Sequence, residues 1–409
     1  MRLLHTGDWH LGASTGGVSR TPDFERFFEW LREVVATRAV DVLVVAGDVF
    51  EHAQPSAEAL ALYYDALDRL VGSGLRAVVV VGGNHDSAAR LDAPRDLLAR
   101  LAVHVVGGLP AGILEAGPDA LARALVRIDD LVVLAVPYLH EYRLGVRQSA
   151  ADANANTIRD ALALAFRILY MKLVELARSR WPTARLVATG HLVAAGARPG
   201  DWGAHIHQVG VIGALPADVF DPRLAYVALG HLHRSFEVTG PERGGPPTWY
   251  CGSPVALTLE EARSLRQVLL VDLPPGEPAR VQPLVVPTFR ELVALEGTPE
   301  DLVAALGSVR SSAPLPPLVH VRAHVEGWVP NLDKALGAAL EAAGVGARIA
   351  GLRQIGPDDG DADPDLAGLP RVPALLSDHD PEAVFLHLAE TRGEPVDDVL
   401  LEAFRGLVR

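Results

Sequence analysis

Three short strand-like segments near the start of the chain constrain the fold most, because each is followed at once by polar residues. These segments are Arg2–Thr6, Asp41–Ala46 and Leu75–Val81. Two stretches whose apolar residues recur at helical spacing, Pro22–Arg38 and Ser56–Leu70, separate them. Strands that alternate with helices form parallel sheets with right-handed crossovers. We therefore expect an α/β fold that begins within the first ninety residues.

Polar side chains stand where each of these strands ends. Asp8 and His10 follow the first strand, Asp48 follows the second, and the GGNHD motif at 82–86 follows the third. The carboxyl ends of parallel strands meet at one edge of a sheet, where open α/β folds place their sites. Side chains two residues apart on an extended chain point to the same side, so Asp8 and His10 can bind one ion together.

Two later strands end in histidines in the same manner. Arg185–Gly190 leads to His191, and Arg223–Leu229 leads to the GHLH motif at 230–233. The candidate ligands are two carboxylates, one amide oxygen and four imidazoles, namely Asp8, Asp48, Asn84, His10, His191, His231 and His233. These groups suit divalent first-row metals such as Mn, Fe or Zn, whereas Mg and Ca prefer sites lined mainly by oxygen.

So many ligands exceed the needs of one ion and predict two, with one carboxylate shared between them. Two-metal centres activate a water and neutralise phosphate oxygens during displacement at phosphorus. His85 is adjacent to Asn84 but is not needed as a ligand. We expect it to protonate the leaving oxygen or to stabilise charge in the transition state.

Composition bounds the class of protein. The chain has 409 residues, of which 49% are hydrophobic and 22% charged, as expected for a globular enzyme. Cys251 is its single cysteine, and no apolar run is long enough to span a bilayer, so we expect a cytoplasmic protein. The net charge of -14 does not exclude DNA, because much of the acidity lies in the tail after residue 356.

The chain divides into four parts. We expect a catalytic domain at 1–273, bounded by the proline-rich stretch Leu273–Pro287, and a small α/β unit at 288–355. Residues 356–373 are rich in Asp, Gly and Pro and predict a flexible acidic linker. Residues 374–409 contain two short amphipathic helices that are expected either to pack on the body or to dock a partner.

The motifs resemble the signature of the calcineurin-like metallophosphoesterases in order and spacing. More narrowly, the sequences DWHLG, GDVF, GNHDS, GHLHR and YCGSP resemble the SbcD family, the nuclease subunits of the bacterial SbcC–SbcD DNA-repair complex. These motifs extend to about Pro254, whereas the later parts match only in layout. The resemblance implies a sandwich of mixed β-sheets flanked by helices, with a small α/β capping domain and a C-terminal helix pair.

The resemblance also implies a role for each candidate. Asp8, His10, Asp48 and His233 would hold one ion, and Asp48, Asn84, His191 and His231 the other. The implied metal is manganese, the bridging ligand is Asp48, and His85 is the catalytic residue that binds no metal. Archaeal relatives often place a histidine directly after the GDxF motif, but Glu51 holds that place here and His52 follows. A catalytic role for either residue is left open.

Several polar residues are expected to have no metal-binding role. His205 and His207 are expected on a surface strand, while His5 and Cys251 are expected to be buried. The arginines that could contact DNA phosphates are Arg20, Arg90, Arg143 and Arg234.

The sequence leads to three functional hypotheses. The first is a manganese-dependent DNA nuclease of the SbcD type in double-strand-break repair and recombination, with exonuclease and endonuclease activity and an SbcC-like ATPase docked on the C-terminal helices. The second is another metallophosphoesterase, such as a phosphatase or cyclic-nucleotide phosphodiesterase. The third, an inactive scaffold, has no support because no expected ligand is missing. We further predict a homodimer formed through helices at 56–70 and 87–101.

Overall fold

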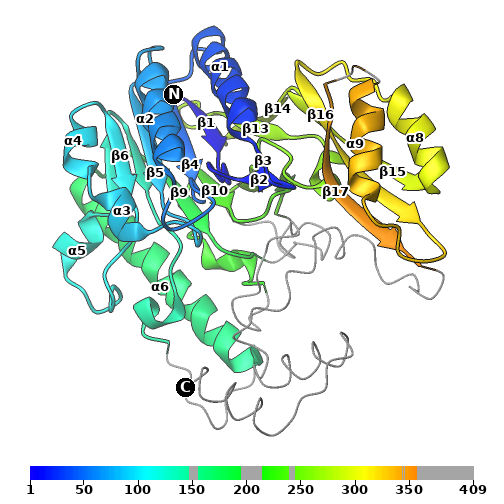
Figure 1. Ribbon diagram of the computed structural model, residues 1–409. Coiled ribbons are helices and arrows are strands. Elements are labelled where there is room, and N and C mark those ends of the chain that lie inside the picture. The colour runs from blue at the N-terminus through cyan, green and yellow to red at the C-terminus, as the bar shows by residue number, and fades with distance from the viewer. Residues whose placement is uncertain (147–154, 195–213, 239–244, 343, 345, 357–409) are drawn as a thin grey trace, which may run out of the picture.

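Two six-stranded sheets stack against each other, and a separate three-stranded sheet stands beside them (Figure 1). The computed structural model describes residues 1–146, 155–194, 214–238, 245–342, 344 and 346–356. The expected linker after Gly356 and the helix pair at 374–409 lie outside these residues, as do His205 and His207.

The first sheet has the strand order β14-β13-β1-β4-β5-β6. Its strands are β1 Arg2–Thr6, β4 Val42–Ala46, β5 Ala77–Val81, β6 Val103–Val106, β13 Gln267–Asp272 and β14 Arg280–Val285. Strands β1, β4, β5 and β6 are parallel, as the alternation of strands and helices predicts, whereas β13 is antiparallel to β1 and β14 is antiparallel to β13. The expected domain boundary is thereby corrected, because the proline-rich stretch supplies β14 and the first sheet continues beyond residue 273.

The second sheet has the order β11-β12-β10-β9-β8-β7. Its strands are β7 Leu125–Ile128, β8 Leu131–Leu134, β9 Arg185–His191, β10 Tyr226–Gly230, β11 Phe236–Glu237 and β12 Thr248–Tyr250. The four central strands run parallel, and both edge strands are antiparallel to their neighbours. Parallel strands β9 and β10 therefore place His191, the last residue of β9, and His231, which follows β10, at the same edge.

Burial on both faces explains why the central strands are apolar without interruption. On β4, Val42 and Val44 belong to the core shared with the second sheet, whereas Leu43 and Val45 pack with the helices on the other side. All four side chains are fully buried. Parallel strands covered on both faces show this continuous apolar pattern rather than an alternating one.

Helices cover the outer faces of the sandwich. Helices α1 (Thr21–Thr37) and α2 (Ala57–Val71) lie over the first sheet, and α6 (Ala155–Arg180) packs on the second (Figure 1). Ser56 caps α2 by accepting a hydrogen bond from the Ala59 N–H. Shorter helical elements are α5 Pro118–Ala122, η1 Glu141–Leu144, η3 Ala217–Val219 and α7 Leu259–Ala262. Within the described residues, no helix combines the length and apolar character needed to cross a membrane.

The prediction of one continuous helix at 87–101 is wrong. The segment forms two short helices, α3 (Ala88–Asp92) and α4 (Arg95–Ala99), with Pro94 between them. Proline lacks the backbone N–H that a helix interior requires, and its ring clashes with the preceding turn.

A three-stranded parallel sheet forms a separate unit, which we call the cap. Its strands are β15 Arg290–Gly297, β16 Leu315–His324 and β17 Arg348–Ile355, and its helices are α8 Pro299–Ser308 and α9 Leu332–Ala342. Both helices lie on one face of the sheet, on the side away from the sandwich (Figure 1). The cap has its own apolar core, to which Leu306 and Leu336 contribute fully buried side chains.

A buried ion cluster joins the cap to the first sheet's helices. The carboxylate of Asp23 at the start of α1 lies 2.7 Å from a guanidinium nitrogen of Arg20 and 2.9 Å from Arg290 Nε. Arg20 also donates to Thr15 on the hairpin formed by β2 (Ser14–Thr15) and β3 (Val18–Ser19). Arg20 is only 1% exposed, so the expectation that it contacts DNA is corrected: its charge is neutralised by Asp23 inside the protein.

Candidate metal centre

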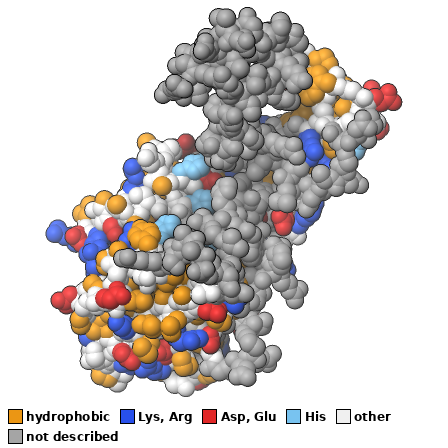
Figure 2. Space-filling view, turned by 90° about the horizontal axis from the view of Figure 1, so that it is seen from below, with side chains coloured by type: hydrophobic (Ala, Val, Ile, Leu, Met, Phe, Trp, Pro, Cys, Tyr) orange, Lys and Arg blue, Asp and Glu red, His pale blue; other side chains and the backbone are white. Residues whose placement is uncertain are grey.

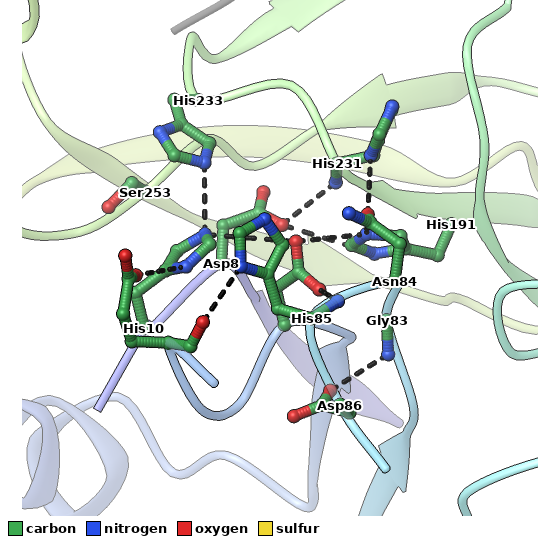
Figure 3. Close-up of polar contacts among 12 residues, drawn as sticks. Asp8, His10, Gly83, Asn84, His85, Asp86, His191, His231, His233 and Ser253 are labelled. Carbon is green, nitrogen blue, oxygen red and sulfur yellow. Dashed lines mark hydrogen bonds and ion pairs between the residues drawn. The ribbon is translucent and has the colours of Figure 1, made fainter. Parts of the chain in front are cut away.

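The polar residues that follow the strands of both sheets converge at one place (Figure 3). The backbone N–H of His231, after β10, donates to Asp8 Oδ1, after β1, at 2.8 Å. Left-handed backbone angles occur at four of these positions, with φ of 49° at Asp8, 51° at His10, 46° at Asp48 and 95° at His231. Non-glycine residues adopt such angles at a cost of about 1–3 kcal/mol each, which the surrounding fold must offset, and they concentrate at functional sites.

One half of the centre is formed by Asp8, His10, Asp48 and His233. The Nε2 atoms of His10 and His233 face each other at 3.0 Å, and His10 Nε2 lies 3.7 Å from Asp48 Oδ2. Asp8, His10 and Asp48 each have one possible ligand atom that lies within 4.8 Å of those of the other two. Two imidazole nitrogens directed at one point can share one proton or bind one cation, so this half has the form of a metal site.

The other half is formed by Asp48, Asn84, His191 and His231. Asn84 Oδ1 lies 3.0 Å from His191 Nε2 and 2.9 Å from His231 Nδ1. His191 Nε2 is also 3.2 Å from Asp48 Oδ2. Because Asp48 lies near side chains of both halves, it is the candidate for a bridging ligand.

Two motif glycines are required by the closeness of these groups. A Cβ at Gly83 would lie 2.1 Å from Asp48 Oδ1, and a Cβ at Gly47 would lie 2.3 Å from His191 Nδ1. Gly47 also has φ of +96°, which side-chain-bearing residues adopt rarely. These glycines therefore allow the backbone to approach the ligands.

The charge of the centre fits divalent cations. Asp8 Oδ2 is buried without a hydrogen-bond partner among the described residues, and burial raises the pKa of this carboxyl. Burial alone would lower the pKa values of the His10 and His191 imidazoles. Glu51 and Asp48 instead raise that of His10 to about 9, and Asp48 raises that of His191 to about 9. The carboxylates thus favour the protonated, positively charged form of these two imidazoles. Bound cations would supply that positive charge instead.

Outer carboxylates support the first half of the centre. Glu261 Oε1 lies 2.7 Å from His233 Nδ1, and Glu51 Oε2 lies 2.9 Å from His10 Nδ1. Burial acts to raise the pKa of Glu261, but His233 lowers it to about 2. In the second half, His191 Nδ1 instead faces the neutral carbonyl of Ala46 at 2.8 Å. Such partners fix the ring and its tautomer, and they leave the other nitrogen free for a metal.

Sequence reasoning missed Glu261 and left Glu51 open. The pattern TLEEA at 258–262 indicates only a helix start, which Thr258 caps by accepting from the Glu261 N–H. Nothing in that pattern reveals that Glu261 turns inward to a histidine 28 positions earlier. His52 is exposed, so of the two open candidates it is Glu51 that contacts the centre.

His85 lies beside the candidate ligands, and the backbone of Glu51 holds its ring. Its Nδ1 is 2.8 Å from the Glu51 carbonyl oxygen, and its ring centroid is 4.8 Å from that of His10. Its backbone N–H donates to Asp48 Oδ1 at 2.9 Å. Asp86 completes the motif by accepting from the N–H groups of Val49, Phe50 and Gly83, which ties the loops after β4 and β5 together.

The remaining candidates lie apart from the ligands. His5 is buried, and its Nδ1 lies 2.9 Å from the Tyr226 hydroxyl; Cys251 is also buried. Arg90 and Arg234 are exposed and Arg143 is partly buried, so these three arginines stay predicted DNA contacts.

The fold and this centre define a calcineurin-like metallophosphoesterase. A family model described as calcineurin-like phosphoesterase matches residues 1–134. The SbcD subunit of the SbcCD nuclease from Rhodobacter capsulatus is 36% identical over 365 residues, covering 86% of this chain and 87% of that protein. The SbcD protein of Escherichia coli K12 is 32% identical and covers 83% of this chain and 82% of its own. The chain belongs to the SbcD family of nuclease subunits.

A third relative connects this family to DNA repair. The DNA double-strand break repair protein Mre11 of Methanopyrus kandleri is 41% identical over 104 residues, which are 25% of this chain and 23% of that protein.

Proposed function

We propose that this metal-dependent nuclease of the SbcCD type hydrolyses phosphodiester bonds of DNA at the centre described above. The observation that carries the proposal is the convergence of seven candidate ligand side chains in two adjacent groups that share Asp48. The proposed substrates are duplex DNA ends for exonuclease activity and single-stranded or hairpin DNA for endonuclease activity. The proposed setting is double-strand-break repair and recombination in the cytoplasm, on the nucleoid.

The bound cations would supply a nucleophilic water at neutral pH and neutralise charge on the phosphate. Asp8, His10, Asp48 and His233 would hold one, and Asn84, His191 and His231 would hold the other together with Asp48. Imidazole, carboxylate and amide ligands in one site are compatible with Mn²⁺, which is the metal we propose.

His85 is the proposed general acid. Because its Nδ1–H is directed at the Glu51 carbonyl, its Nε2 is the nitrogen that exchanges a proton. The ring stands beside His10, so it can reach a leaving oxygen at the adjacent phosphorus without itself binding metal.

The decisive experiment combines metal occupancy with hydrolysis. With added Mn²⁺, the protein should cleave labelled duplex DNA and bis(p-nitrophenyl) phosphate and should hold two ions in manganese-soaked crystals. His85→Ala should keep both ions and lose most hydrolysis. A single ion, or metal loss in the His85 variant, contradicts the assignment. Cleavage of monoesters alone would favour a phosphatase.

A homodimer through α2 and the α3–α4 segment is also proposed, but not through all the apolar residues that the sequence offers in the first of these helices, namely Leu60, Leu62, Tyr63, Leu67 and Leu70. Tyr63, Leu67 and Leu70 are buried against the first sheet and cannot form an interface. Exposed apolar side chains are instead Tyr64 at 39%, Leu97 at 65% and Leu101 at 55%. Light scattering should show a dimer that Leu97→Glu dissociates; a monomer at micromolar concentration contradicts it.

We also propose that Asp380–Val408, which lies outside the described residues, docks an SbcC-like ATPase. Apolar residues recur there at helical spacing: Val384, Phe385, Leu388, Val399, Leu400, Phe404 and Leu407. Truncation after Pro373 should preserve nuclease activity on simple substrates and abolish co-purification of the ATPase. Full ATPase binding by the truncated protein, or its unfolding at room temperature, contradicts the proposal.

A further inference from the structure

Three aromatic rings lead from the metal centre to the surface along the segment after β8. They belong to Tyr138, His140 and Tyr142, at alternate positions of the sequence PYLHEYR. The His140 ring is 4.9 Å from that of Tyr138 at 82° and 5.7 Å from that of Tyr142 at 18°. We call these three side chains the aromatic row.

The inner end of the row touches the centre itself. The Tyr138 ring lies 6.2 Å from the ring of the ligand His191, edge to face. The backbone N–H of Tyr138 donates to the Gly82 carbonyl at 2.8 Å, which joins the row to the GGNHD motif. The row therefore begins beside the second half of the centre.

The core holds the row in place. Leu139 and Leu144, which interrupt and follow it, are 5% and 2% exposed and belong to the main apolar core. The guanidinium of Arg143 donates to the Leu109 carbonyl, and the Arg143 carbonyl accepts from the Gly112 N–H. Leu139, Leu144 and Arg143 thus anchor the segment to the body, while the row runs from the partly buried Tyr138 to the exposed His140 and Tyr142.

The outer end of the row is exposed to solvent. The Tyr142 side chain is 58% exposed, and the Arg143 guanidinium carbon lies 5.4 Å from its ring centroid. Histidine side chains gather on the face shown in Figure 2, beside hydrophobic ones. An exposed aromatic ring with a stacked imidazole and an adjacent cation presents the elements that bind unpaired bases.

We propose that Tyr142, His140 and Arg143 form a stacking platform for an unpaired nucleobase of a DNA strand whose phosphate occupies the metal centre. This inference rests on the proposed nuclease function. Continuity with the centre through Tyr138 favours a nucleic acid strand over a protein segment, because the strand must already lie there for cleavage. Any base can stack on an aromatic ring, so the platform favours single-stranded DNA without selecting a particular base.

The platform should act on DNA much more than on a small ester. Removing a ring that stacks on a base weakens binding by about 5- to 150-fold. For Tyr142→Ala we expect the ratio of kcat/KM on a single-stranded oligonucleotide to that on bis(p-nitrophenyl) phosphate to fall by such a factor, mainly through KM. Tyr142→Phe, which keeps the ring, should restore the ratio. Trp328→Ala, which removes an aromatic side chain 80% exposed on the cap, is the control and should not change it.

A direct measure of stacking uses the full chain with Mn²⁺ and a single-stranded oligonucleotide carrying 2-aminopurine at successive positions. Fluorescence should be quenched at one position near the cleaved bond, and the quenching should disappear in Tyr142→Ala. An unchanged DNA-to-ester ratio with no quenching overturns the platform even when both substrates are cleaved. An unchanged ratio with lost binding of an ATPase partner also overturns it and assigns the ring to a protein contact. Failure of the unaltered protein to cleave either substrate would instead refute the proposed nuclease function.

Discussion

Replacing Glu261 by Gln should weaken one metal site and spare the other. The two carboxylate oxygens of Glu261 have separate partners, with Oε1 at 2.7 Å from His233 Nδ1 and Oε2 at 2.7 Å from the Leu257 N–H. A glutamine offers one oxygen and one NH₂ group, so it can satisfy only one of these two donors. The change also removes the negative charge behind His233.

The size of the effect follows from this geometry. Loss of an outer carboxylate behind a metal-binding histidine costs about 10- to 100-fold in metal affinity, or about 1.4–2.8 kcal/mol. His233 serves only the first half of the centre, whereas Asp48 is shared and is not touched. We therefore expect one manganese dissociation constant to rise by this factor. The unpaired donor should lower the free energy of unfolding by about 1–3 kcal/mol.

Isothermal titration with Mn²⁺ can separate the two binding steps in the unaltered protein and in Glu261→Gln. Glu237→Gln, which changes an exposed glutamate on β11, is the matched control and should leave both constants unchanged. The hypothesis is refuted if Glu261→Gln leaves both constants within twofold of the unaltered protein. It is equally refuted if both constants rise together, since that would indicate general unfolding of the centre.

Further perturbations test other parts of the structure. Gly83→Ala should abolish binding of both ions in the same titration, because its Cβ would stand 2.1 Å from the shared Asp48 carboxylate; near-normal binding would contradict the close approach. Asp23→Ala should lower the free energy of unfolding by about 3–5 kcal/mol in urea denaturation, since it leaves buried arginines unpaired; a loss below 1 kcal/mol would contradict this. Removing metal with EDTA should lower stability by about 2.7 kcal/mol for each site, relative to a solution holding Mn²⁺ at 100 times the dissociation constant of that site.

The sequence by itself determined the parallel strands of the first sheet and named the candidate ligands that the fold brings together. Apolar runs such as Asp41–Ala46 can be buried only on both faces of a sheet, and the polar residue after each run must then emerge at its edge. This local rule required no knowledge of the distant chain, and it named both Asp48 and His191 as candidates. A small α/β unit at 288–355 was predicted for the same reason, because the periodicities of its strands and helices are local.

Tertiary structure alone decided what lies behind and beside the ligands. Glu261 reaches His233 and Arg290 reaches Asp23 across 28 and 267 positions of sequence, and no local pattern encodes such pairs. The prediction for Arg20 was wrong for this reason, because a sequence does not show whether an arginine is exposed to solvent or paired with a buried carboxylate. The aromatic row likewise became visible only when the fold placed Tyr138 against His191. Backbone propensity and burial are local properties, whereas the partner of a charge or a ring depends on how distant segments pack.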